Sequence, residues 1–120
     1  MPPAGCVPPA ADAEPRGCYR PLVILEHAVL PVRPGKESDF LEAFGAAKQI
    51  IASMTGFHRL KLSRCIEQPS TFLLLVEWET LEDHTEGFRS SAEYREWRRL
   101  LHHFYDPFPV VEHFKEVLEV

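Results

Sequence analysis

The residues of this 120-residue chain that could do chemistry gather in the segment 71–114. It holds both tryptophans, four of the six histidines and two of the three tyrosines. Histidine titrates near neutrality and can move protons, whereas the indole ring of tryptophan gives a pocket a flat apolar wall. Whatever this protein binds, we expect the wall of its pocket to lie in this segment.

A second polar feature lies in the apolar segment 22–32, where Glu26 and His27 interrupt a run of aliphatic residues. Polar side chains in so apolar a strand must find partners. Neighbouring residues of a strand face opposite sides of the sheet. We therefore expect one of the two to point into the pocket and the other into an interface between two copies of the chain.

Strands and helices of ordinary length must position these groups. Apolar and β-branched residues predict a strand over 22–32, and one apolar stripe predicts a helix over 36–53. Alternation predicts two antiparallel strands over 57–67 and 71–78, joined by the turn 68–70. The helical stripe consists of Phe40, Phe44, Ala47, Ile51 and Met54. One face of the strand 71–78 carries Phe72, Leu74, Val76 and Trp78.

Two capping boxes mark helix starts in the second half of the chain. The first opens a short helix that Gly87 should break, and the second opens a helix over 90–104. Pro107 and Pro109 stop this helix, and a terminal strand is expected over 110–120. The capping boxes are Thr80 with Asp83 and Ser90 with Glu93.

The order β-α-β-β-α-β predicts an α+β fold of the ferredoxin-like kind, a four-stranded antiparallel sheet with both helices on one face. The uncovered face would still carry Leu73, Leu75 and aliphatic residues of the first strand. That is too much apolar surface to leave in water. A second copy stacking sheet on sheet would bury it, so we expect a homodimer.

Composition narrows the class of protein. A hydrophobic fraction of 45% and a net charge of −5 fit a globular domain and disfavour nucleic acid or an anionic membrane as partner. Three cysteines without CxxC spacing favour reduced thiols in the cytoplasm. Residues 1–20 hold five of the eleven prolines and few large apolar side chains, so we expect a disordered tail before a domain over 21–120.

Three features taken together resemble the antibiotic biosynthesis monooxygenase (ABM) domain family. They are the order of elements, the tryptophan that closes the third strand (VEWETLEDH) and the ending HHFYDPFPVVEHF. The resemblance covers about residues 22–120. It implies a dimeric α+β barrel with a pocket in each subunit between the helices and the sheet. Some members oxidise phenolic or hydroquinone-like aromatics there with O₂, using neither metal nor flavin.

Residue by residue, the resemblance matches Trp78 to the pocket tryptophan of the family and Arg98 to a helix arginine of its polyketide-oxidising members. His84 falls where those members place a tyrosine. Leu74 stands where they carry an asparagine. Phe88 stands where a haem-degrading branch needs a histidine, so haem degradation is not expected.

Cofactor-free oxygenation needs a base, a donor for the developing anion and a dry aromatic pocket. His84 or His102 could be the base, and Arg98 could hold a phenolate. Trp78, Trp97 and Phe104 could flank the substrate ring. The clustering of residues and the resemblance together predict a pocket for a flat aromatic molecule, with Trp78 as its floor and His84, Arg98 and His102 as its polar groups. Glu26 and His27 complete the candidate substrate-binding residues. The expected partners are therefore a small phenol, hydroquinone or polyketide-like aromatic, O₂ and a second copy of the chain, with no cofactor.

Each candidate has an ordinary structural alternative. Trp78 could be core, His84 could be exposed, and Arg98 could be a surface charge worth about 0.3 kcal/mol in a helical ion pair. Six histidines with Glu26 and Glu112 could bind a metal, but no HxH or HxxxH spacing marks such a site. A non-catalytic dimeric module that binds an aromatic or quinone is the alternative to the oxygenase.

Overall fold

A computed structural model of the chain describes residues 23–120. The tail expected over 1–20 lies outside the described residues, together with Cys6 and Cys18. Four strands form one antiparallel sheet in the order β2-β3-β1-β4. The elements are β1 (Ile24–Pro31), α1 (Glu37–Ala52), β2 (Phe57–Arg64), β3 (Thr71–Trp78), the π-helical turn η1 (Asp83–Phe88), α2 (Ala92–Leu101), the 3₁₀ turn η2 (His102–Phe104) and β4 (Val111–Lys115).

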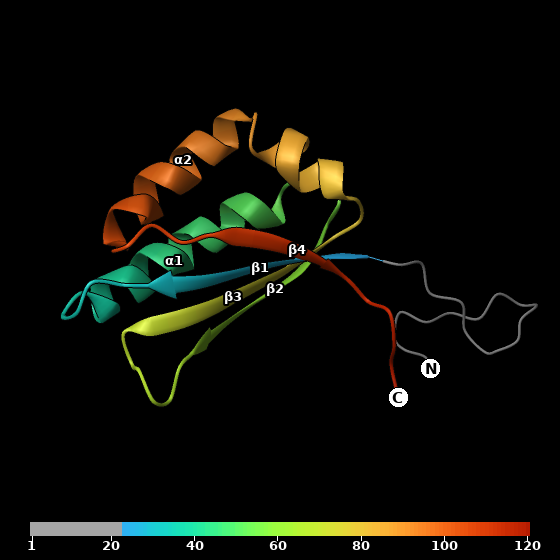
Figure 1. Cartoon of the computed structure of the whole chain (residues 1–120). Helices are drawn as coiled ribbons and strands as arrows, with labels where there is room; N and C mark the ends of the chain where they lie inside the picture. Colours follow the sequence, from blue (N-terminus) through green and yellow to red (C-terminus); the bar gives the residue numbers. More distant parts are fainter. Residues whose placement is uncertain (1–22) are drawn as a thin grey trace, which may run out of the picture.

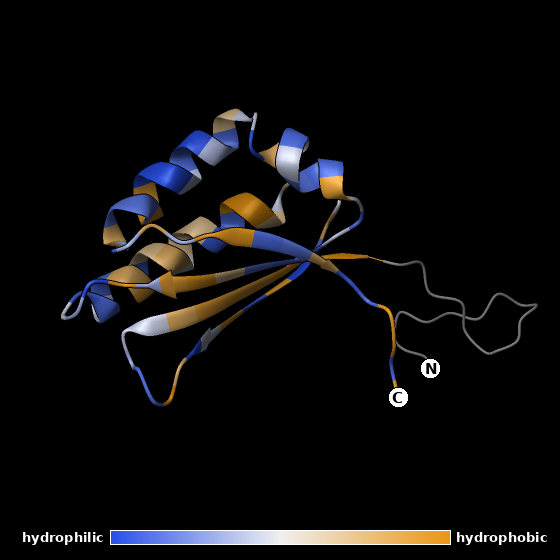
Figure 2. Ribbon diagram, viewed as in Figure 1, coloured by the Kyte–Doolittle hydropathy of each residue, from blue (hydrophilic) through white to orange (hydrophobic). Residues whose placement is uncertain are grey.

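This is the ferredoxin-like α+β fold predicted from the order of elements. Both helices lie on one face of the sheet, and no element among residues 23–120 covers the other face (Figure 1). β1 is central and pairs with β3 on one side and β4 on the other. Figure 2 shows that β3 and much of α1 are apolar, whereas α2 is polar over much of its visible surface. The main core therefore lies between the sheet and the helices.

The apolar stripe of α1 is packed as its spacing predicts. Phe40 lies against Phe72 of β3 with ring centroids 5.0 Å apart, and Phe44 lies against Trp97 of α2 at 5.6 Å. Gly56, with φ of +83°, then turns the chain into β2 in a conformation that residues with a Cβ avoid. The buried residues of α1 are Phe40, Phe44, Ala47 and Ile51, and Met54 is partly buried.

The alternation of β3 is also confirmed. One face is buried beneath the helices, and the other face is only half-buried. Trp78, at the end of this strand, is fully buried and lies opposite Ile24 of β1 and Phe57 of β2. The buried residues are Phe72, Leu74, Val76 and Trp78, and the half-buried ones include Leu73, Leu75 and Glu77.

The sequence had suggested that Gly87 breaks the short helix before α2, but the helix continues through this residue. The first capping box is present, since Asp83 N donates to Thr80 Oγ1 at 3.1 Å and Thr80 N donates to Asp83 Oδ2 at 3.2 Å. The turn η1 then runs through Gly87 to Phe88. Glycine in a helix costs only about 1 kcal/mol, and burial of the Phe88 ring offsets that cost.

The N-cap of the second helix lies one residue later than predicted. Ser91 is the N-cap, and its Oγ accepts a hydrogen bond from Tyr94 N at 3.0 Å. Ser90 N donates to the carbonyl of Glu86 at 3.2 Å, so Ser90 still belongs to the preceding turn and cannot cap α2. The capping box predicted at Ser90 is therefore wrong.

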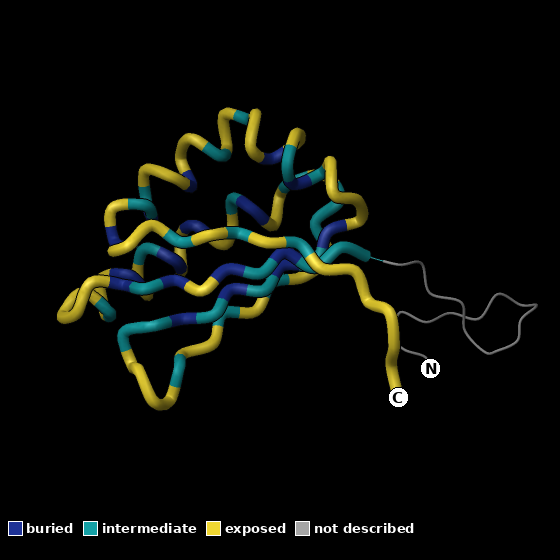
Figure 3. Tube along the Cα trace, viewed as in Figure 1, coloured by how far each residue is buried: buried dark blue, intermediate teal, exposed yellow. Residues whose placement is uncertain are grey.

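Several elements are shorter than predicted. The first strand ends at Pro31 and the second at Arg64, and α2 ends at Leu101 before the 3₁₀ turn. The terminal strand covers only Val111–Lys115, because β4 pairs with β1 and Lys115 lies opposite Ile24, the first residue of that strand. The chain beyond is exposed, as Figure 3 shows.

The uncovered face of the sheet, called the outer face below, carries apolar side chains interspersed with charged ones. Val29 of β1 and Phe114 of β4 are each 47% exposed on it. Arg59 and Glu77 form an ion pair there, at 3.8 Å between Nε and Oε2. The apolar residues of the outer face are Leu25, Val29, Leu73, Leu75 and Phe114. No helix within residues 23–120 is long and apolar enough to cross a membrane.

Candidate active site

A cavity of about 390 Å³ lies between the helix-covered face of the sheet and a roof formed by η1, α2 and the segment that leads into β4. Its floor comes from β1 and β3. Its wall combines apolar and aromatic side chains with the polar groups of a glutamate, an arginine, two histidines and two tyrosines. The lining residues are Glu26, Ala28, Leu30, Leu74, His84, Phe88, Arg89, Tyr94, Trp97, His102, Tyr105, Phe108, Pro109 and Val111.

Glu26 is the one buried carboxylate among the described residues. It projects from β1 to the helix side of the sheet and is only 5% exposed. Trp78 Nε1 donates a hydrogen bond to Glu26 Oε1 at 2.9 Å. Burial raises the pKa of Glu26 from 4.5 to about 7, although the Trp78 hydrogen bond and the charge of Arg89 both lower it. The carboxyl group is therefore poised to gain or lose a proton near neutral pH.

His84 lies directly against this carboxyl group. It comes from η1, is 3% exposed, and its ring stacks on that of Trp78 with centroids 5.3 Å apart. His84 Nε2 is 3.4 Å from Glu26 Oε1, which is within ion-pair distance. The pair is nevertheless not a salt bridge at neutral pH, because burial lowers the pKa of His84 to about 3, with further lowering by Arg89 and His113. A neutral imidazole thus faces a carboxyl group that is partly protonated.

The second ring nitrogen of His84 meets another histidine. His84 Nδ1 is 2.8 Å from Nε2 of His113, a half-buried residue of β4. The pairing of β4 with β1 sets His113 directly across from Glu26 in the sheet. Burial and the charge of Arg89 lower the pKa of His113 below its ordinary value. Sequence reasoning missed His113, although alternation along β4 could have placed it on the helix side with Val111.

Arg89 supplies the positive charge of the cavity. It follows η1 directly, lines the cavity and is otherwise exposed to solvent. Its charge lowers the pKa of Glu26, His84 and His113 alike. A cation close to three titratable groups favours the ionised carboxylate and disfavours protonated imidazole. Sequence reasoning missed Arg89 as well.

The far wall of the cavity carries further titratable rings. Burial, followed by the charge of Arg98, lowers the pKa of His102 to about 4. Burial raises the pKa of Tyr105 above its ordinary value. Both side chains are therefore neutral at pH 7. The edge of His102 lies against Phe108 with ring centroids 4.8 Å apart, which closes this end of the cavity.

Four of the residues predicted for the site line the cavity: Glu26, His84, Trp97 and His102. Trp78 lies behind His84 and supports it, so it does not form the exposed floor that was expected. The alternative in which Trp78 is a core residue is confirmed, and the alternative in which His84 is exposed is wrong, because both side chains are buried.

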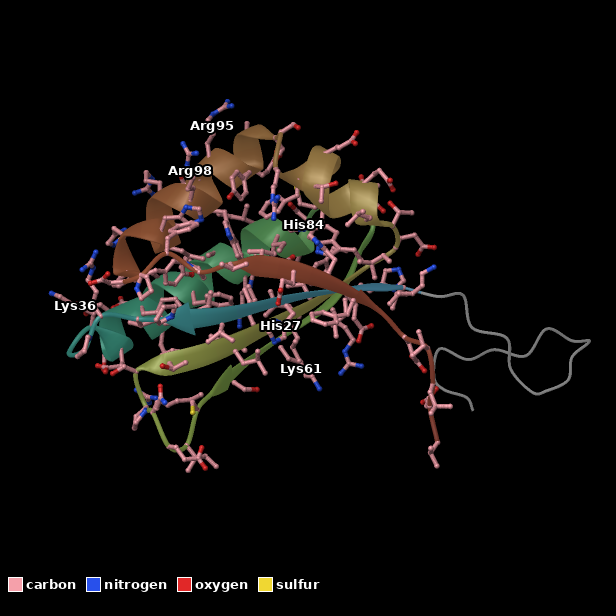
Figure 4. The ribbon with its side chains drawn as sticks, in the orientation of Figure 1. His27, Lys36, Lys61, His84, Arg95 and Arg98 are labelled. Carbon is pink, nitrogen blue, oxygen red and sulfur yellow. The ribbon has the colours of Figure 1, made fainter. Side chains whose placement is uncertain are left out.

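Besides Trp78, three predicted residues lie outside the cavity lining. Phe104 is buried against Phe40, with ring centroids 5.7 Å apart, and belongs to the core. Arg98 points away from the sheet beside Arg95, and both line a separate open hollow on the surface of α2 (Figure 4). His27 lies on the outer face (Figure 4), where its ring meets the edge of Phe114 at 5.4 Å.

The placement of Glu26 and His27 follows the strand alternation, with one side chain in the cavity and the other on the outer face. His27 Nδ1 is buried and has no hydrogen-bond partner within residues 23–120. In the same part of the chain, no group of three or more His, Cys, Asp or Glu side chains is arranged to hold a metal ion.

Comparison with known proteins gives two kinds of match. A model of the family described as "Antibiotic biosynthesis monooxygenase" matches residues 23–100. The uncharacterised protein YczJ of Bacillus subtilis is 55% identical over 95 residues, which cover 79% of this chain and all of that protein.

Solved structures share the fold. A protein of Bordetella bronchiseptica, provisionally named an antibiotic biosynthesis monooxygenase, superposes with a TM-score of 0.77 at 37% identity, covering 81% of this chain and 99% of that one. A Streptomyces coelicolor monooxygenase from the gene ActVA-Orf6, in complex with nanaomycin D, has a TM-score of 0.71 at 16% identity, with coverages of 82% and 91%. At that identity the second match speaks for the fold alone.

Proposed function

Because the chain belongs to the antibiotic biosynthesis monooxygenase family, we propose that it oxidises a small phenol, hydroquinone or polyketide-like aromatic with O₂, without a metal or organic cofactor. The observation that carries this proposal is Glu26. A carboxyl group with a pKa of about 7, buried in an aromatic cavity, is the base that such a reaction requires.

The base acts as a pair. Glu26 takes the acidic proton of the substrate, and His84, 3.4 Å away and neutral, accepts a hydrogen bond from the protonated carboxyl group. Trp78 holds the same carboxylate oxygen, so the base stays in one orientation. General base catalysis of this kind typically contributes about 10²- to 10⁴-fold. His102, which the sequence had suggested as a base, faces the other end of the substrate.

The oxidation conserves atoms and electrons. The deprotonated substrate gives one electron to O₂, and the resulting radical and superoxide combine to form a C–O bond as a peroxide. In an anthrone-like substrate the reacting carbon is a methylene, and loss of its remaining proton with cleavage of the O–O bond turns it into a carbonyl. The second oxygen leaves as hydroxide and, with a returned proton, becomes water. Only the substrate and O₂ are consumed, because the groups that carry protons are regenerated.

Arg89 takes the part that the sequence had suggested for Arg98. A phenolate and a peroxide are both anions, and a fixed cation beside them lowers the energy of the transition state. Arg89 lines the cavity, whereas Arg98 lines the surface hollow of α2. Phe88 and Trp97 supply apolar walls for the ring of the substrate.

The proposal includes a homodimer formed through the outer face and the cytoplasmic location expected from the cysteines. The outer face carries apolar side chains that water would otherwise contact, and half-exposed Val29 and Phe114 lie among them. A second sheet stacked on this face would bury them. It would also cover His27, whose buried Nδ1 could find its partner across the interface.

The test uses the purified full chain, stripped of metal by chelation, with a panel of hydroquinones and anthrone-like phenols. O₂ consumption is followed with an electrode. Glu26→Gln keeps the shape of the side chain and removes the base, so kcat should fall by about 10²-fold or more. The matched control is Glu42→Gln, an exposed carboxylate of α1, which should leave turnover unchanged. Equal turnover in both variants would exclude Glu26 as the base.

A non-catalytic binding module is the second candidate, favoured by Leu74 at the position where the oxygenases carry an asparagine. Leu74 lines the cavity, so this difference lies at the site itself. Ligand binding without O₂ consumption by any member of the panel would establish this second function.

A further inference from the structure

Three side chains from three separate elements form a continuous line that ends at the edge strand. Glu26 comes from β1, His84 from η1 and His113 from β4. The successive distances are 3.4 Å from Glu26 Oε1 to His84 Nε2 and 2.8 Å from His84 Nδ1 to His113 Nε2. We propose that these residues form a proton relay that connects Glu26, buried at the inner end of the cavity, with solvent at β4. The relay rests on the proposed function and adds a residue, His113, to its machinery.

The geometry suits a relay because His84 uses a different nitrogen for each neighbour. When Glu26 carries the proton, its hydroxyl donates to His84 Nε2, and His84 Nδ1–H donates to His113 Nε2. When Glu26 is ionised, His84 Nε2–H donates to the carboxylate, and His113 Nε2–H donates to His84 Nδ1. One proton has then left the carboxyl group and one has arrived on His113, which is protonated on both nitrogens until its Nδ1 proton passes to solvent. No atom has moved further than a hydrogen bond, and His84 is neutral in both states.

Packing fixes the ring that must pass the proton. His84 stacks on Trp78 with an interplanar angle of 19°, and it lies near the ring of Phe88 at 6.3 Å. Trp78 and Phe88 also lie against one another, with ring centroids 5.9 Å apart, so the three rings form one cluster that keeps each nitrogen of His84 against its own partner. The sheet register fixes the two ends, because Glu26 and His113 lie opposite one another in neighbouring strands.

The outer end of the relay can reach water. β4 is an edge strand, and His113 is half-buried, whereas Glu26 and His84 are nearly inaccessible. A base that takes a proton at every turnover must release or return it. A substrate that fills the cavity would cut Glu26 off from water on that side. His113 provides a path that a bound substrate leaves open.

The charges around the three relay residues favour release of the proton rather than its retention on a histidine. Trp78 of β3 donates to Glu26, and Arg89 lowers the pKa of all three members. Tyr94 and His102 face the cavity from α2 and η2, and Tyr105 from the segment that follows. Within residues 23–120, Glu26 is the one carboxylate that lines the cavity, so no second anion from this part of the chain would hold an imidazolium in place.

The first test needs no substrate. Nitrogen-15 NMR of histidine-labelled full chain reports which nitrogen of each ring carries the proton between pH 5 and 9. His84 and His113 should change tautomer together, with a midpoint near pH 7 where Glu26 titrates. In Glu26→Gln this joint transition should disappear. A His84 that keeps one tautomer across that midpoint, or changes without His113, would overturn the relay.

The second test measures turnover with a substrate from the phenol panel. His113→Gln keeps a hydrogen-bonding group but cannot relay a proton, so kcat should fall by about tenfold or more with little change in KM. Added imidazole should restore part of the loss. The control is His103→Gln, an exposed histidine of the surface hollow on α2. Wild-type kcat in His113→Gln, with its thermal unfolding unchanged, would refute the role.

The two failures can be told apart. If no phenol is oxidised but the joint tautomer change is seen, the relay stands and the proposed reaction is wrong. If O₂ is consumed but the tautomers do not change together, the oxygenase stands and the relay is wrong.

Discussion

Replacing Glu26 by glutamine should stabilise the folded protein at alkaline pH. The glutamine carbonyl can still accept the hydrogen bond from Trp78, and its volume is nearly that of glutamate. The variant removes only the possibility of a buried charge. The stability of the folded state and the activity should therefore change in opposite directions.

The magnitude follows from the pKa of Glu26, which rises from 4.5 to about 7 on folding. Between these values the folded protein holds a proton that the unfolded chain has lost. The contribution of Glu26 to stability is therefore fully present below pH 4.5 and is lost as the pH rises through 7. Linkage gives a loss of roughly 1 kcal/mol at pH 5 and roughly 3 kcal/mol at pH 8. Glu26→Gln avoids this loss.

The assay is denaturant unfolding at pH 5 and pH 8, at one protein concentration. The free energy of unfolding of Glu26→Gln, relative to wild type, should be higher at pH 8 than at pH 5 by roughly 2 kcal/mol. His84, with its pKa lowered to about 3, loses stability only as the pH falls below 6.5 and does so in both proteins. Glu42→Gln, which changes an exposed residue of α1, should show no such pH dependence. The same response in both variants would refute the buried, proton-holding Glu26.

Three further predictions concern the cation, the interface and the tail. Arg89→Ala should raise the transition-state free energy by about 2–3 kcal/mol in kcat/KM, whereas Arg98→Ala should change it little; the reverse result would return the role to Arg98. Leu75→Glu on the outer face should give monomers in sedimentation, and Leu41→Glu on α1 should not; a dimer in both would place the interface elsewhere. Deleting residues 1–20 should leave the thermal midpoint within about two degrees, and a large drop would show that the tail packs on the domain.

The fold could be predicted because local residue patterns indicate most of its helices and strands. The alternation of β3 and the stripe of α1 are set by residue spacing, and the structure keeps both. The element ends were harder. β4 stops at Lys115 because its partner strand begins at Ile24. This pairing joins residues far apart in the sequence, so the local residue pattern does not show it. Ser91 replaced Ser90 as the helix cap because the preceding turn extends through Gly87.

The site was predictable only in part, because the direction in which each side chain points depends on details of helix geometry and strand register. Trp97 points inward from α2, so Arg98, about 100° further around the helix, must point elsewhere. Arg89 was overlooked because it follows a π-helical turn, whose direction ordinary helical spacing does not predict. His113 enters the site through its register with Glu26, which links residues far apart in the sequence.

The central claim is that Glu26 and its cavity carry out oxygen insertion without a cofactor. The most direct measurement is turnover under ¹⁸O₂ with metal-stripped full chain and an anthrone-like phenol, followed by mass spectrometry of the product. We expect one ¹⁸O atom in the product carbonyl, the other in water, and little product from Glu26→Gln. Product without label accompanied by hydrogen peroxide, or equal labelled product from Glu26→Gln, would contradict it.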